Sequence, residues 1–137
     1  MQFNEDSRYI NLGTTHGFRI LSSIHDKPVE KDELRETGGA KFVLSTSNLV
    51  VYARGHESCP SKELIVYDDD HNRESSKIVF KDKEIRGIRL TKKCLLVILE
   101  NSSYLFSLNK SGDIYREPYL LKKFATASNP AGVGCLC

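Results

Sequence analysis

Short runs of β-branched, leucine and aromatic residues, each bounded by glycine, asparagine, aspartate, serine or proline, recur along the whole sequence. Runs of this length and composition are typical of β-strands, and the turn residues between them favour antiparallel meanders. We expect strands over residues 9–13, 17–22, 41–45, 49–53, 63–67, 77–80, 85–90, 94–100, 103–108 and 119–124. The sequence therefore predicts an all-β protein.

The expected strands group into units of four that repeat at roughly forty residues, which is the period of a β-propeller blade. One unit covers residues 41–84 and the next covers 85–126. An opening hairpin and a charged, exposed loop precede them over 1–40, and residues 127–137 resemble the start of a further blade. Because a propeller closes with about four to eight blades, we expect residues 1–137 to form the N-terminal part of one propeller domain, about two to three four-stranded antiparallel blades of a truncated ring.

The run CLLVIL at residues 94–99 lacks the polar alternation of a half-exposed strand, which predicts a strand covered on both faces. It is also the longest apolar run, far shorter than the roughly 18 residues that span a bilayer. The N-terminus MQFNED is acidic and no apolar segment follows it, unlike a signal peptide. We therefore expect a cytoplasmic protein whose four cysteines are reduced.

Charge is distributed unevenly along the chain. Residues 1–75 hold 9 Lys and Arg against 13 Asp and Glu, whereas residues 76–137 hold 11 against 5. A basic half could serve an acidic partner, a nucleic acid or an anionic membrane, but it is also what solvated strand faces carry.

Chemistry-bearing motifs are scarce. His16, His25, His56 and His71 fall in expected turns or loops without an accompanying nucleophile motif. The DDD run at 68–70 lacks the spaced oxygen ligands and the glycine of a calcium loop, so we expect a solvated turn. We predict that the protein is not an enzyme and has no catalytic, cofactor or metal site.

Three segments, in this order, resemble the PROPPIN family of WD-repeat β-propellers, which includes the WIPI proteins. Residues 12–20, LGTTHGFRI, look like the opening hairpin of the family. Residues 88–105, from IRLTKK through LLVILE to SYL, are similar to the second-blade hairpin, which has basic residues at its turn. Residues 128–136, SNPAGVGCL, resemble the Asn-Pro-x-Gly start of the third blade.

This resemblance implies a seven-bladed WD40-like ring that recognises phosphatidylinositol 3-phosphate or the 3,5-bisphosphate in autophagy and membrane trafficking. Such a scaffold is cytoplasmic and peripheral on autophagic or endosomal membranes. The lipid-binding signature Phe-Arg-Arg-Gly belongs to a later blade and does not occur in these residues. The resemblance therefore implies no lipid-binding residue in this chain, and membrane contact through later blades.

The early blades of the family bind autophagy proteins, which gives candidate partner-binding residues. Pro60 and Lys62 resemble the Pro-basic element of a second-blade loop that docks a lipid-transfer protein. Lys92 resembles a basic residue that holds an acidic helix, whereas the second basic position of that site falls on Asn109. A solvated loop and a solvated turn are the alternatives at these two places.

Two other functions stay open at this stage. One is a WD-repeat protein-interaction scaffold without lipid affinity. The other is a small β nucleic-acid-binding module that uses the basic part from Lys77 onward. Tyr104 and Phe106 share one strand face, as core residues do, which weighs against exposed stacking platforms, so we expect no nucleic acid as partner.

Overall fold

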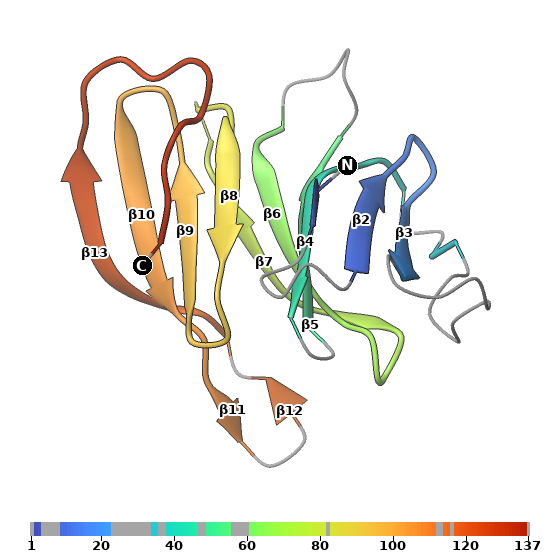
Figure 1. The fold of residues 1–137 in the computed structure, drawn as a ribbon. Coiled ribbons are helices and arrows are strands. Elements are labelled where there is room, and N and C mark those ends of the chain that lie inside the picture. Colours follow the sequence, from blue (N-terminus) through green and yellow to red (C-terminus); the bar gives the residue numbers. More distant parts are fainter. Residues whose placement is uncertain are drawn as a thin grey trace.

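The structure is a computed structural model that describes residues 2–3, 9–22, 34–35, 38–46, 49–55, 61–81, 83–111, 114–115 and 117–136. All regular structure within these ranges is β-strand, which confirms the all-β prediction. The strands form separate antiparallel sheets that stand side by side (Figure 1). Their bounds are β1 (Gln2–Phe3), β2 (Tyr9–Gly13), β3 (Phe18–Ser22), β4 (Ala40–Thr46), β5 (Leu49–Arg54), β6 (Glu63–Asp68), β7 (Arg73–Val79), β8 (Gly87–Leu90), β9 (Cys94–Ile98), β10 (Ser102–Ser107), β11 (Lys110–Ser111), β12 (Ile114–Tyr115) and β13 (Tyr119–Ala125).

The central sheet has the sequential order β4-β5-β6-β7, a meander in which each strand pairs with the next. β5 and β6 are almost entirely buried because both faces of this sheet are covered. A register shift between Lys41 and Leu44 interrupts the pairing of β4 with β5, and Phe42 there has a φ of 54°. Such a bulge strengthens the local twist of an edge strand.

The second four-stranded sheet has the order β13-β10-β9-β8. Residues Leu95 to Leu99 are all buried, which confirms the prediction of a strand covered on both faces. Between β10 and β13 the chain forms the short β11-β12 hairpin, which the sequence pattern did not indicate. β13 is exposed along its whole length and closes the sheet on the outside.

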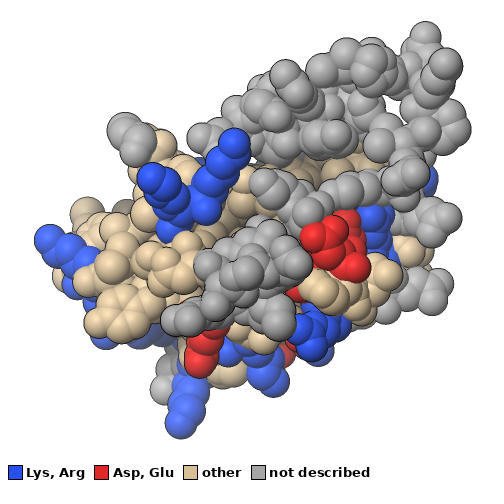
Figure 2. Space-filling view, turned by 90° about the horizontal axis from the view of Figure 1, so that it is seen from below, with Lys and Arg blue, Asp and Glu red and all other residues tan. Residues whose placement is uncertain are grey.

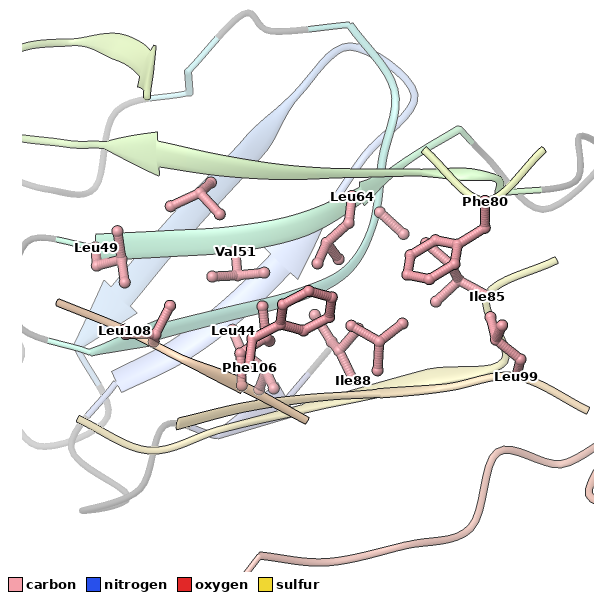
Figure 3. Close-up of a cluster of buried hydrophobic side chains, with 14 residues drawn as sticks. Leu44, Leu49, Val51, Leu64, Phe80, Ile85, Ile88, Leu99, Phe106 and Leu108 are labelled. Carbon is pink, nitrogen blue, oxygen red and sulfur yellow. The ribbon is translucent and has the colours of Figure 1, made fainter. Parts of the chain in front are cut away.

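The main hydrophobic core lies between these two sheets (Figure 3). Leu64 and Val51 project into it from the central sheet, and Ile88 and Phe106 from the second. Burying one such aliphatic or aromatic side chain contributes about 1.5–3 kcal/mol. This packing joins the two meanders face to face, and the edge strands β4 and β8 contact each other.

The sheet β1-β2-β3 covers the opposite side of the central sheet. Phe18 is fully buried there, with its ring centroid 5.6 Å from that of Tyr52 and 5.2 Å from that of Tyr67. A Cβ atom at Gly13 would lie 2.3 Å from the carbonyl oxygen of Ala40, so only glycine allows β2 to approach β4 this closely. The described strands thus form three sheets packed in a row, together with a separate two-stranded hairpin between β10 and β13.

Strand β7 begins at Arg73, four residues before the predicted strand at 77–80. The turn before it is held by Asp68, whose Oδ1 accepts hydrogen bonds from the amides of Asp70 and His71. Asn72 then adopts a φ of 50°, a left-handed conformation that asparagine tolerates. Pairing with β6 extends the strand through the polar residues 73–76, which carry no strand signal of their own.

Candidate functional site

The predicted partner-binding residues lie in two places. Lys62 is exposed directly before β6, and its carbonyl oxygen accepts a hydrogen bond of 2.8 Å from the amide of Phe80. Pro60 lies outside the described residues. Lys92 is exposed in the β8-β9 turn, where the amide of Thr91 donates to the carbonyl oxygen of Cys94 at 2.9 Å.

These two lysines occupy opposite ends of the sheets. Lys62 lies where β6 begins, which is the end that carries the β9-β10 turn, at the top of Figure 1. Lys92 lies in the β8-β9 turn at the bottom of Figure 1. Asn109 is exposed. It lies near Lys92, since the amide of the neighbouring residue Leu108 donates to the carbonyl oxygen of Lys93 at 2.8 Å. The structure therefore does not bring Lys62 and Lys92 into one site.

A groove of about 360 Å³ opens at the end that carries Lys62. We call it the rim groove. It is formed by the residue before β6, the β7-β8 connection and the β9-β10 turn, and thus lies across the junction of the two four-stranded sheets. Its lining residues are Lys62, Lys83, Glu84, Arg86, Leu99, Glu100, Asn101 and Ser102.

Arg86 is the central charge of the rim groove. Its backbone amide donates to the carbonyl oxygen of Ile98 at 2.8 Å, which fixes the residue beside the end of β9. Its Nη2 lies 3.6 Å from Glu84 Oε2 and 3.6 Å from Glu100 Oε2, both longer than a hydrogen bond. The guanidinium is thus held loosely between two carboxylates.

Several buried polar atoms beside the rim groove have no hydrogen-bond partner in the described part of the chain. They include Arg86 Nε and the hydroxyl oxygens of Ser61 and Ser102. Ser61 precedes Lys62, and its carbonyl oxygen accepts from the amide of Ile85 at 2.6 Å. Sequence reasoning missed these residues, since an isolated serine at a strand boundary gives no signal of burial.

A second, apolar groove of about 430 Å³ lies between β7 and the outer strands of the second sheet. We call it the outer groove. Tyr104 lines it with its ring centroid 5.1 Å from that of Phe80, and Lys123 Nζ lies 5.2 Å from the centroid of the Tyr104 ring. Lys83 lines both grooves, so the outer groove lies next to the rim groove.

The expected turn follows β6 and Asp70 is exposed in it, but the DDD run at 68–70 is not solvated along its whole length. Asp68 is buried, and its Oδ2 lies 2.7 Å from Nδ1 of His71. Burial favours the neutral acid, but the hydrogen bonds from the His71 side chain and backbone outweigh it, so the pKa of Asp68 lies below its ordinary value. Within the described ranges, no group of three or more histidine, cysteine or acidic residues could hold a metal ion.

The basic residues do not form one stripe on the face that Figure 2 shows. Lysine and arginine side chains stand there in several separate groups over the described surface. Among the described residues, no helix has the length and apolar character needed to cross a bilayer.

Two neighbouring four-stranded meanders, packed face against face with β4 beside β8, define a portion of a β-propeller. The chain superimposes on this class of fold: Hsv2 of Kluyveromyces lactis matches with a TM-score of 0.67 at 13% identity, over 90% of this chain and 35% of that one. The partial propeller predicted from the sequence is thereby confirmed.

Sequence comparison finds relatives of the chain, although no family model matches it. The chain is 24% identical to SVP1-like protein 2 of Neurospora crassa over 135 residues, 98% of this chain and 30% of that protein. It is 25% identical to autophagy-related protein 18 of Dictyostelium discoideum over 139 residues, 99% of this chain and 34% of that protein. The chain is related to the PROPPIN family, as its motifs predicted, and spans about a third of the length of these relatives.

Proposed function

We propose that this chain is the N-terminal portion of a PROPPIN-type scaffold that acts in autophagy and membrane trafficking. In this proposal the whole protein is cytoplasmic and peripheral on autophagic or endosomal membranes. It recognises phosphatidylinositol 3-phosphate or the 3,5-bisphosphate through later blades, and the early blades recruit protein partners without catalysis. The observation that carries the proposal is the similarity to autophagy-related protein 18 over 99% of this chain.

The proposed blade division follows the repeat period. Residues 1–40 supply the opening hairpin and a loop, 41–84 and 85–126 supply two blades, and 127–137 begin the next blade. Two features support the last assignment. Arg89 Nε donates to the carbonyl oxygen of Gly134 at 2.8 Å, and Asn129 Nδ2 donates to that of Val133 at 2.8 Å, so this segment is bound beside β8.

Pro60, Lys62 and Lys92 remain our candidate partner-binding residues. The exposure of Lys62 beside the rim groove and of Lys92 on its turn supports this assignment. Because the two lysines lie at opposite ends of the sheets, we propose that they serve two separate partners.

A protein-interaction propeller without lipid affinity is the alternative that the same fold supports. The nucleic-acid alternative has less support, because Phe106 is buried and Tyr104 packs against Phe80 and Phe106 in the core instead of standing free for stacking.

Liposome flotation with graded phosphatidylinositol 3-phosphate tests the lipid claim. We expect this chain to stay in the lipid-free fraction and a longer form that includes later blades to float with the lipid. If neither form floats, lipid recognition is wrong and the protein-interaction propeller remains. Flotation of this chain alone would contradict the assignment of lipid binding to later blades.

A further inference from the structure

The rim groove contains hydrogen-bond donors that the described protein does not use. Ser102 lines it, is 7% exposed and has no partner for its hydroxyl. Arg86 lines it as well, and its buried Nε also lacks a partner. Leaving buried donors unpaired costs stability, and when such groups gather at a groove a ligand that accepts their hydrogen bonds removes that cost.

The charges of the groove favour an acceptor that carries negative charge. Lys62 and Lys83 line the groove and are exposed, and neither pairs with a carboxylate of the described residues. Glu84 and Glu100 offset only part of this charge, because both share Arg86 and Glu84 also faces Lys41 at 4.0 Å. The side chains that line the groove therefore carry more positive than negative charge.

A single carboxylate fits these surroundings better than a phosphate group. Two glutamates line the groove, so a phosphate with nearly two negative charges would meet stronger repulsion than one carboxylate. The outer groove adjoins the rim groove at Lys83, which favours a chain molecule that carries apolar side chains next to its acidic group. A polypeptide segment meets both conditions.

We propose that Ser102, Arg86 and Lys83 form a receptor for an acidic side chain of a partner polypeptide, with the apolar side chains beside it lying in the outer groove. The Ser102 hydroxyl and Arg86 Nε donate to the carboxylate, and Lys83 neutralises it. This inference rests on the proposed function, since it names the chemistry of a protein partner at the early blades.

The test is a titration of the chain, followed by amide and arginine Nε–H signals in NMR spectra. The probe is a short blocked peptide of glutamate and leucine, compared with its glutamine counterpart and with inorganic phosphate. We expect the glutamate peptide to shift the Arg86 Nε–H signal and the Ser102 amide, and the glutamine peptide to bind about tenfold more weakly, as expected for loss of one charged hydrogen bond.

Two variants identify the receptor, and a third serves as control. Ser102→Ala and Arg86→Lys should each weaken the glutamate peptide about tenfold, whereas Lys93→Ala, at the opposite end of the second sheet, should not. Ser102→Ala should also leave the unfolding midpoint unchanged or raised, because it removes an unpaired buried hydroxyl. If Arg86→Lys fails to fold, peptide binding by the folded Ser102→Ala variant still tests the receptor.

Three results would overturn the inference. They are equal binding of the glutamine peptide, tighter binding of phosphate than of the glutamate peptide, and affinity that is insensitive to Ser102→Ala. None of them affects flotation of the longer form with lipid, so failure here is distinct from failure of the proposed function.

Discussion

Arg35 and Asp69 form a two-pronged ion pair, with Arg35 Nε 3.1 Å from Asp69 Oδ1 and Nη2 3.1 Å from Oδ2. The pair joins the segment before β4 to the turn after β6. Its side chains are only 12% and 4% exposed, and the Arg35 guanidinium lies 5.8 Å from the centroid of the Phe18 ring. Removing one partner would leave a nearly buried charge.

We expect Arg35→Ala to lower the free energy of unfolding by about 3 kcal/mol, because Asp69 would remain buried without this guanidinium. Urea denaturation measures the change. Lys77→Ala is the control, since Lys77 forms an exposed pair with Glu63 at 3.8 Å and should cost less than about 1 kcal/mol. Equal effects of the two substitutions would show that the Arg35 pair is as weak as a surface pair.

Asp68 predicts a loss of stability in acid. Its pKa is lowered in the folded chain from an ordinary value of 3.8. The ionised carboxylate therefore stabilises the folded chain fully at pH values above 3.8, and this stabilisation is lost as the pH falls through the lower folded-state pKa. We expect the unfolding free energy of the wild type to fall more steeply than that of Asp68→Asn as the pH is lowered from about 5. Parallel pH profiles for the two proteins would contradict the hydrogen-bonded turn.

Gly132 predicts a local effect on the segment after β13. It has a φ of 66°, and a Cβ atom there would lie 2.1 Å from the carbonyl oxygen of Arg86. We expect Gly132→Ala to cost about 1–3 kcal/mol and to accelerate hydrogen exchange of the Asn129 and Val133 amides.

Gly38→Ala is the matched control for that substitution. Gly38 has a φ of 82°, but a Cβ atom there would contact nothing within 4 Å. Gly38→Ala should therefore lower the free energy of unfolding only by the left-handed backbone strain, about 1–2 kcal/mol, because no clash is added. If Gly132→Ala costs no more than Gly38→Ala and leaves the exchange rates unchanged, the segment does not depend on its contact with Arg86.

A substitution of Leu64 tests how much the core between the two meanders contributes to stability. Leu64 is fully buried, and we expect Leu64→Ala to lower the free energy of unfolding by about 2–5 kcal/mol. Leu121 on β13 is 52% exposed, so Leu121→Ala should change stability by no more than about 0.5 kcal/mol. Thermal and urea unfolding both report the difference, and a large effect of Leu121→Ala would indicate that β13 is covered in solution.

Strands were predictable where the residues themselves carry an apolar, β-branched pattern. β5, β6 and β9 lie within about one residue or two of their predicted bounds for this reason. The first part of β7 has no such pattern, and it is a strand because β6 offers it a hydrogen-bonding edge. The β11-β12 hairpin likewise has no strand pattern in its sequence, since each of its strands has only two residues.

The candidate site was predictable only in part. Lys62 and Lys92 could be singled out as basic residues beside turns, but their separation at opposite ends depends on the direction in which each strand runs. Ser102 and Arg86 gave no signal, because a serine and an arginine are usually exposed and only packing between the sheets buries their polar atoms.

The sequence by itself determined that the chain forms antiparallel meanders with a blade-like period, because strand propensity and turn chemistry are local properties of neighbouring residues. Only the tertiary structure decided which residues share a groove, which carboxylates pair with which cations, and which polar atoms remain buried without partners. Those relationships arise between residues far apart in the chain, and they depend on how two sheets pack rather than on any pattern within one of them.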